Sequence, residues 1–178
     1  MGLVLDLREL RGPEDRVEHT YPAAVFAGGR SDEYAVAGSV ALALQVRKDG
    51  DKCRISGSVR TVLSLACSRC LERFEAPGDL TVDLLYLPDT ENRGGEEAEI
   101  AEEDLSIAFY RDNQIDLLQM VHEQCQLALP MKPLCRDACR GLCPVCGANR
   151  NERSCNCDTT WRDPRFAALE NLIGGPRH

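Results

Sequence analysis

Six of the ten cysteines of this chain lie in one short stretch, and this stretch constrains the fold more than any other feature. It runs from Cys135 to Cys157 with the sequence CRDACRGLCPVCGANRNERSCNC. Within it, Cys143-Pro-Val-Cys146-Gly147 has the form of a zinc knuckle, a tight turn that directs two thiolates at one metal ion. Zn²⁺ favours four such ligands in a tetrahedron. The stretch therefore predicts a structural zinc site that is built from little chain.

The spacing leaves open which four of the six thiols bind. The most compact set consists of Cys143, Cys146, Cys155 and Cys157. Either Cys135 or Cys139 could replace one of the last two, and a two-metal cluster with shared thiolates is a further arrangement. One zinc ion per chain is the simplest expectation.

Disulfides are the alternative use of clustered cysteines, and the expected compartment argues against them. The N-terminal sequence MGLVLDLREL carries charges where a secretory leader needs an apolar run. No stretch approaches the roughly 20 apolar residues of a membrane span. We therefore expect a cytoplasmic protein with no membrane partner, and in a reducing compartment clustered cysteines usually bind metal.

Two further cysteines, Cys67 and Cys70, form a CxxC pair far from the tail. Buried structural thiols are the first interpretation of this pair and a metal site is the second, for example a ribbon-like site shared with Cys143 and Cys146. A redox couple is the least favoured interpretation, because such couples lie at a helix N-terminus in a βαβ unit, whereas this pair follows a hairpin. Cys53 and Cys125 stand alone in apolar patterns and are interpreted as small buried hydrophobes. Gly38 and Gly57 are interpreted as bulges or close approaches of another backbone.

The cysteine motifs carry a family resemblance. The run LCRDACRGLCPVCGANRN, ending in CNC, resembles the C-terminal signature of the YceD-type large ribosomal RNA subunit accumulation proteins of bacteria and plastids. Cys67-Ser-Arg-Cys70-Leu, followed by Glu72 and Phe74, is similar to a second landmark of that family. Ala138 departs from the Asp that many members carry. The resemblance spans about residues 35 to 157 and implies a structural metal together with a role in accumulation of large-subunit ribosomal RNA.

The remaining pattern predicts an α+β fold. Residues 33–47 and 53–66 predict a long β-hairpin around the turn Lys48-Asp49-Gly50-Asp51, and residues 80–87 continue the sheet. Residues 116–129 predict a helix that begins at an Asp116 cap and ends at Pro130, and residues 107–110 predict a last short strand. Strands this long favour a twisted or partly closed antiparallel sheet. One or two helices pack on it, and the zinc unit follows.

This division predicts two parts. Residues 1–130 form a β-rich core domain with an acidic loop at 88–104, and residues 131–178 form the zinc-binding tail. Asp163-Pro164 and the apolar stripe that follows predict a C-terminal helix. The acidic loop is interpreted as a solvated charge run, with a docking site for a basic partner as the alternative.

The net charge of −8 argues against non-specific binding of phosphate by the chain as a whole, so nucleic acid would need local basic faces. Such faces are predicted in the hairpin and in the tail. The candidate contacts are Arg47, Lys52, Arg54, Arg60, Arg69, Arg73, Arg136, Arg140, Arg150 and Arg153.

No catalytic constellation is evident in the sequence. It has three histidines, no phosphate-binding glycine loop and no paired nucleophile and base, and His122 beside Glu123 is interpreted as a solvated or satisfied pair. We therefore expect a non-enzymatic factor without a small-molecule substrate. The resemblance to the YceD-type family implies large-subunit ribosomal RNA or a pre-ribosomal particle as its partner, and a basic ribosomal protein drawn to the acidic surface is the alternative. The alternative function is a redox-switched zinc chaperone, since oxidants could open a four-thiolate centre.

Overall fold

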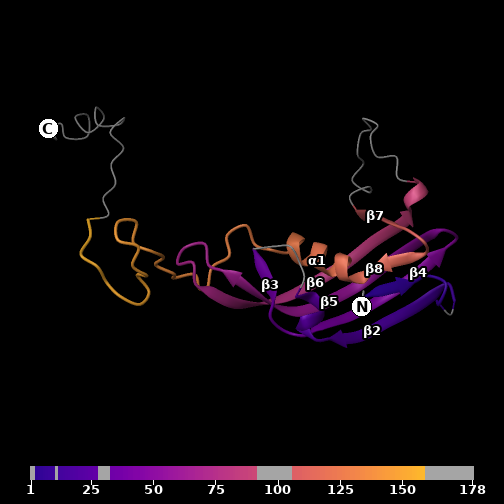
Figure 1. The fold of residues 1–178 in the computed structure, drawn as a ribbon, viewed down its shortest axis with the longest axis horizontal. Helices are drawn as coiled ribbons and strands as arrows, with labels where there is room; N and C mark the ends of the chain where they lie inside the picture. Colours follow the sequence, from indigo (N-terminus) through magenta and orange to yellow (C-terminus); the bar gives the residue numbers. More distant parts are fainter. Residues whose placement is uncertain (1–2, 11, 28–32, 92–105, 159–178) are drawn as a thin grey trace, which may run out of the picture.

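A computed structural model describes residues 3–10, 12–27, 33–91 and 106–158 of the chain. Its main sheet has six strands, five of them in the order β2-β4-β5-β6-β7, and β3 pairs with β5 off this path (Figure 1). The strands are β2 (Glu14–Tyr21), β3 (Tyr34–Val36), β4 (Val40–Asp49), β5 (Lys52–Ala66), β6 (Arg73–Pro88) and β7 (Ile107–Tyr110). A separate two-stranded sheet pairs β1 (Val4–Asp6) with β8 (Gln114–Asp116).

The two longest strands form the centre of the sheet. β5 and β6 have 15 and 16 residues and pair antiparallel from Cys53 opposite Tyr86 to Ala66 opposite Arg73. The predicted hairpin turn before β5 is confirmed, with Gly50 in the left-handed region at φ 59°. At Gly57 the strand passes so close to β4 that a Cβ would overlap the Ala43 carbonyl oxygen, which confirms the predicted close approach.

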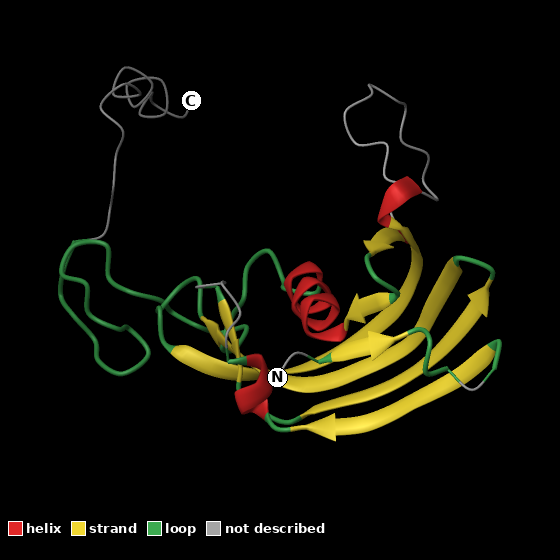
Figure 2. Cartoon of the chain, turned by 45° about the vertical axis from the view of Figure 1, so that its right-hand side comes forward, coloured by secondary structure: helices red, strands yellow, loops and turns green. Residues whose placement is uncertain are grey.

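Alternation of apolar residues gives the sheet one buried face. On β4, Val40, Leu42, Leu44 and Val46 are each at most 3% exposed, while the residues between them face solvent or are half-buried. This period of two is what a sheet with one covered face requires. Figure 2 shows the sheet strongly curved, with the helix on its inner side.

The covering helix is α1 (Leu117–Leu127), close to the predicted range of 116–129. Its N-cap is Asp116, whose carboxylate accepts a hydrogen bond from the Gln119 backbone N–H at 3.0 Å. The helix buries Leu117, Met120, Val121 and Cys125 against the sheet. His122 and Glu123 both have partners, because Tyr34 Oη contacts His122 Nδ1 at 3.0 Å and Gln119 donates to Glu123 at 2.7 Å.

The structure differs from the sequence expectation in three elements. Residues 33–47 do not form one strand: the strand is interrupted at Gly38, where the N–H groups of Ala37 and Gly38 both donate to the Val62 carbonyl at 2.8 and 3.3 Å, and β3 pairs with the far end of β5. β7 joins β6 in parallel, so the sheet is mixed rather than wholly antiparallel. The sequence of residues 23–32 has no clear period and predicts a loop, whereas the structure has a short 3-10 helix, Ala23–Phe26, that buries Phe26.

The chain after α1 leaves the sheet as an extended tail (Figure 1). Among residues 128–158 the regular structure consists of turns and an isolated bridge between Leu142 and Asn149. The predicted C-terminal helix and most of the predicted acidic loop fall at 159–178 and 92–105, outside the described residues. No described helix combines the length and apolarity needed to cross a membrane.

Candidate metal centre

The first CxxC pair forms a tight turn at the end of the β5-β6 hairpin. The Leu71 backbone N–H donates to the Cys67 carbonyl at 2.9 Å, and Cys67 N–H donates to the Glu72 carbonyl at 2.9 Å. Leu71 has φ 64°, a left-handed conformation that costs a non-glycine residue of the order of 1 kcal/mol. The turn is thus held in an unfavourable backbone conformation with both thiols on one side.

The tail pair repeats this geometry. The Gly147 N–H donates to the Cys143 carbonyl at 2.9 Å, and Gly147 has φ 71°. Here the left-handed position falls on glycine, which adopts it without a Cβ penalty. The predicted knuckle at residues 143–147 and the turn at residues 67–71 therefore share one hydrogen-bond pattern and one backbone turn.

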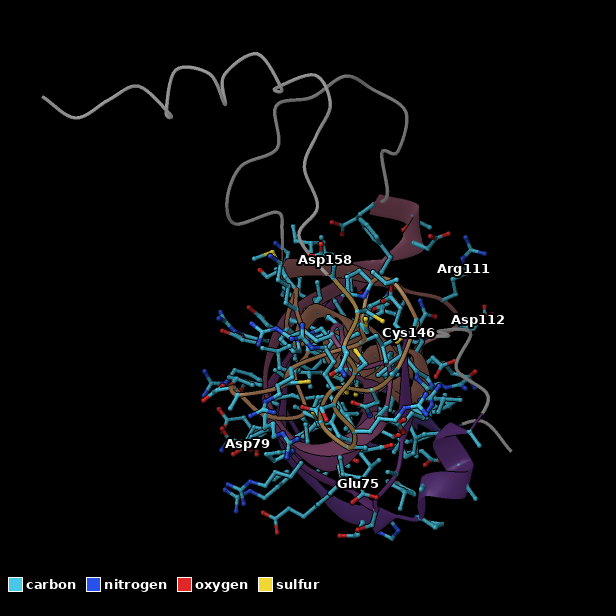
Figure 3. All side chains as sticks on the ribbon, turned by 90° about the vertical axis from the view of Figure 1, so that its left-hand side faces the viewer. Glu75, Asp79, Arg111, Asp112, Cys146 and Asp158 are labelled. Atoms are coloured by element: carbon cyan, nitrogen blue, oxygen red, sulfur yellow. The ribbon has the colours of Figure 1, made fainter. Side chains whose placement is uncertain are left out.

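Eight of the ten cysteines gather into two groups of four. We call them the sheet-side cluster, made by Cys67, Cys70, Cys135 and Cys139, and the tail cluster, made by Cys143, Cys146, Cys155 and Cys157. Within each group the four sulfur atoms lie within 4.8 Å of one another. Either group could hold a metal ion. Figure 3 views the molecule from this end and labels Cys146 of the tail cluster.

This grouping bears on the arrangements that the spacing left open. The most compact set coincides with the tail cluster, while Cys135 and Cys139 lie in the other group. The ribbon-like pairing of Cys67 and Cys70 with Cys143 is not the one observed, because the hairpin pair meets Cys135 and Cys139 instead. All ten cysteines are free thiols in this structure.

The sulfur separations fit a tetrahedral ion. Zinc–sulfur bonds of about 2.3 Å place neighbouring ligands of a tetrahedron about 3.8 Å apart. In the sheet-side cluster, Cys67 Sγ lies 3.8 Å from Cys139 Sγ, and Cys70 Sγ lies 3.8 Å from Cys135 Sγ. These distances are too long for disulfides, whose sulfurs are bonded at about 2.05 Å.

Local hydrogen bonds lower the pKa of Cys67 and Cys139 in the sheet-side cluster and of Cys143 in the tail cluster, which favours ionised thiolates there. Burial opposes ionisation of Cys67, yet backbone N–H groups of Cys135, Cys70 and Arg69 lower its pKa to about 6. The N–H groups of Cys146 and Val145 lower the pKa of Cys143 to about 6.

Burial and neighbouring thiols raise the pKa of other cysteines in both clusters. Burial first, and then the neighbouring thiols, raise the pKa of Cys135 to about 12. In the tail cluster, Cys146 and the other thiols raise the pKa of Cys157 to about 12. Four thiols this close cannot all ionise unless a cation supplies the compensating charge.

Further hydrogen bonds surround the sheet-side cluster. Asn151 Nδ2 donates to Cys139 Sγ at 3.3 Å, and Asn151 Oδ1 accepts from the Arg140 N–H at 2.9 Å. Arg69 donates to the carbonyl oxygens of Cys139 and Asp137 at 2.9 and 3.2 Å. Asn151 could not be found from the sequence, because cysteine spacing does not indicate which residue reaches a thiol across a loop. Arg69 was predicted only as a nucleic-acid contact.

The candidate nucleic-acid residues divide into two sets. Three hairpin arginines form exposed ion pairs: Arg47 with Glu14 at 2.7 Å, Arg54 with Asp83 at 2.7 Å and Arg60 with Asp79 at 3.2 Å. Among the described residues, the exposed Lys and Arg side chains with no acidic partner are Lys52, Arg69, Arg73, Lys132, Arg136, Arg140, Arg150 and Arg153. Five of these eight lie in the tail.

Comparison with known proteins agrees with this architecture. The model of the family described as large ribosomal RNA subunit accumulation protein YceD matches residues 55–173, which include both cysteine clusters. The chain belongs to the YceD family.

Several relatives match over most of the chain. A chloroplastic protein of Arabidopsis thaliana, named a large ribosomal RNA subunit accumulation protein YCED homolog, is 29% identical over 157 residues, covering 75% of this chain and 48% of the relative. Its Zea mays counterpart is 27% identical, covering 86% and 60%. An uncharacterized protein of Mycobacterium tuberculosis is 30% identical over 141 residues, covering 75% and 61%. The chain thus spans about half to three-fifths of the length of these relatives, and no solved structure matches it.

Proposed function

We propose that this protein is a non-enzymatic factor for the accumulation of large-subunit ribosomal RNA, and that it acts in the cytoplasm by binding that RNA or a particle assembling on it. Membership in the YceD family is the observation that carries the proposal. The metal is proposed to be structural zinc, because a closed set of four cysteines leaves no coordination position for a substrate. Ten free cysteines are consistent with a reducing compartment.

The described residues favour the tail over the hairpin as the RNA-binding face. An arginine already paired with a carboxylate must give up that partner before it can bind phosphate, as Arg47, Arg54 and Arg60 would. Arg140, Arg150 and Arg153 are exposed and have no acidic partner in the described part of the chain. Arginine and lysine side chains provide most charged contacts to phosphate, so unpaired guanidinium groups suit this role.

Matched charge reversals test this face. We expect the triple variant Arg140→Glu, Arg150→Glu and Arg153→Glu to lose binding to large-subunit ribosomal RNA and to lower the salt dependence of the remaining binding by roughly one unit of slope per lost phosphate contact. The control is Arg47→Glu, Arg54→Glu and Arg60→Glu, which reverses the same number of charges on the sheet. Zinc content is measured in both, so that a lost metal is not mistaken for a lost contact. Equal loss in both variants would contradict the assignment to the tail.

The role itself is tested in cells. Crosslinking followed by sequencing of bound RNA should recover large-subunit ribosomal RNA, and deletion of the gene should lower its level. If that RNA is not recovered and its level does not change, the proposed function is wrong. If its level falls without crosslinks, the protein acts through a basic ribosomal protein drawn to the acidic surface.

One observation supports the second candidate, a redox-switched zinc chaperone. Cys146 is exposed, so an oxidant could reach the tail cluster. Release of zinc under peroxide, together with newly exposed apolar surface, would favour this chaperone. Retained zinc would favour the ribosomal role.

A further inference from the structure

We propose that the chain binds two zinc ions with different tasks: the ion in the tail cluster folds the tail, and a second ion in the sheet-side cluster fastens the tail to the β5-β6 hairpin. This deepens the proposed function and rests on its assignment of zinc. It replaces the expectation of one ion per chain, because the structure offers two complete sets of four thiols.

The turns at residues 67–71 and 143–147 have equivalent backbone geometry. Residue 71 adopts the same left-handed turn as Gly147 and donates the same hydrogen bond to the first cysteine of its pair, although residue 71 is leucine. Leu71 is 66% exposed, so little packing of its side chain compensates for the backbone cost. A metal ion that requires both thiols of Cys67 and Cys70 supplies a reason for this conformation.

The sheet-side cluster joins the tip of the β5-β6 hairpin to the tail. Its sulfur contacts link residues that are 72 and 65 positions apart in the sequence, from the hairpin tip to the tail. The tail also docks there through its backbone: Ser68 N–H donates to the Pro133 carbonyl at 2.8 Å, and Leu142 N–H donates to the Arg69 carbonyl at 2.9 Å. A Cβ on Gly141 would come within 2.8 Å of that Arg69 oxygen. The two segments therefore meet in close backbone contact.

The junction between hairpin tip and tail buries few apolar residues. Among the described residues its buried members are Cys67, Cys70 and Cys139, with Phe74, Leu134 and Cys135 packed partly buried around them. None of the three buried cysteines belongs to the main core, and Phe74 packs against both clusters. Apolar burial of this extent provides little free energy to hold a tail in place, whereas ligation of zinc by four cysteines contributes far more.

The two clusters are also connected. Asn151 belongs to the loop between Cys146 and Cys155 of the tail cluster, yet its side chain donates to Cys139 Sγ of the sheet-side cluster. A hydrogen bond from an N–H group to a ligand sulfur stabilises the thiolate and orients it. Folding of the tail loop around its own ion therefore brings a supporting group to the other ion.

The zinc count by native mass spectrometry of the full chain is the first test. We expect two ions per chain, and a single ion would overturn the proposal. No zinc at all would instead refute the zinc assignment in the proposed function. The two failures are therefore distinguishable.

Single variants then assign the tasks. Cys135→Ser should leave one ion, and hydrogen exchange should show the hairpin tip and residues 131–142 released while β4 and the rest of β5 stay protected. Cys143→Ser should also leave one ion, with the exchange increase confined to residues 143–157. If the Cys135→Ser variant still binds two ions, or if its tail stays docked on the hairpin, the ion in the sheet-side cluster does not hold the tail in place.

Asn151→Ala measures the connection. We expect zinc at the sheet-side cluster to be about 10-fold or more weaker in competition with a chelator, because outer-shell partners of metal ligands typically have such effects. Asn156→Ala is the matched control, since Asn156 is an exposed asparagine of the tail that lies between Cys155 and Cys157. Equal affinities in the two variants would show that Asn151 does not support the second ion.

Discussion

The sheet and the tail solve the problem of folding in different ways. The sheet buries one continuous apolar face under α1, in a core that runs from Leu7 to Cys125. The tail buries Cys139, Cys143 and Ala148 among residues 128–158, and it has no strand or helix there. A segment with so little apolar surface cannot offset its conformational entropy by burial alone. We therefore propose that metal ligation takes the place of a hydrophobic core in the tail.

Removal of metal should separate the two parts most strongly. In excess chelator we expect residues 131–158 to become sensitive to protease and lose protection from hydrogen exchange, since each structural zinc site contributes on the order of 10 kcal/mol. Strands β4, β5 and β6 should keep their protection away from the hairpin tip, because their core contains no cluster cysteine. Loss of protection throughout β4 would show that the metal also holds the sheet.

A steric change in the sheet should produce the opposite pattern. Gly57→Ala places a Cβ against the Ala43 carbonyl oxygen and 2.9 Å from Leu44 Cα, at a φ of 148°. We expect a loss of about 3 kcal/mol in the free energy of unfolding of the sheet, from strain and displaced backbone, with zinc content unchanged. Gly50→Ala is the control, because nothing lies within 4 Å of its added Cβ, and it should cost about 1 kcal/mol for the left-handed turn alone. Equal midpoints in chemical denaturation would contradict this account of Gly57.

Thiol reactivity should divide the ten cysteines along the same line. Burial raises the pKa of Cys53 and of Cys125 to about 11, so their thiolate fraction at neutral pH is roughly 100-fold below that of an ordinary cysteine. After chelation, the eight cluster cysteines should react with an alkylating reagent while these two do not, and mass spectrometry of the native protein would count them. Rapid labelling of Cys53 would mean that the sheet opens when metal leaves.

Local patterns in the sequence were sufficient for the elements of the sheet. The alternation around Gly50, the Asp116 cap and the apolar spacing of residues 117–125 are short-range signals, and each predicted an element that the structure contains. The interruption between β3 and β4 falls at Gly38, which the sequence marks as a bulge or a close approach without showing that the strand is divided there. The parallel pairing of β7 with β6 was missed because it depends on a contact between separate segments, which local alternation does not encode.

The sequence shows the cysteine motifs, but it does not show which cysteines come together in each cluster. Compactness identified the tail cluster because its four residues are close along the chain. The partners of Cys67 and Cys70 lie at least 65 residues away, and only the fold brings Cys135 and Cys139 to the hairpin tip. Arginine counts likewise could not show which guanidinium groups are paired, since Arg54 and Asp83 meet only across two strands.

The smallest expected effect compares the two knuckles directly. Leu71→Gly should relieve the left-handed strain in the sheet-side turn, while Leu71 is too exposed for the lost side chain to cost much packing. We expect zinc to bind that cluster more tightly by about 1 kcal/mol, or about fivefold, in chelator competition. The reciprocal change, Gly147→Ala, should weaken the tail cluster by a similar factor, because nothing lies within 4 Å of the added Cβ and the φ of 71° alone opposes it. Opposite signs for the two changes would establish that the same turn serves both ions, and weaker binding in Leu71→Gly would show that the leucine side chain itself supports the sheet-side cluster.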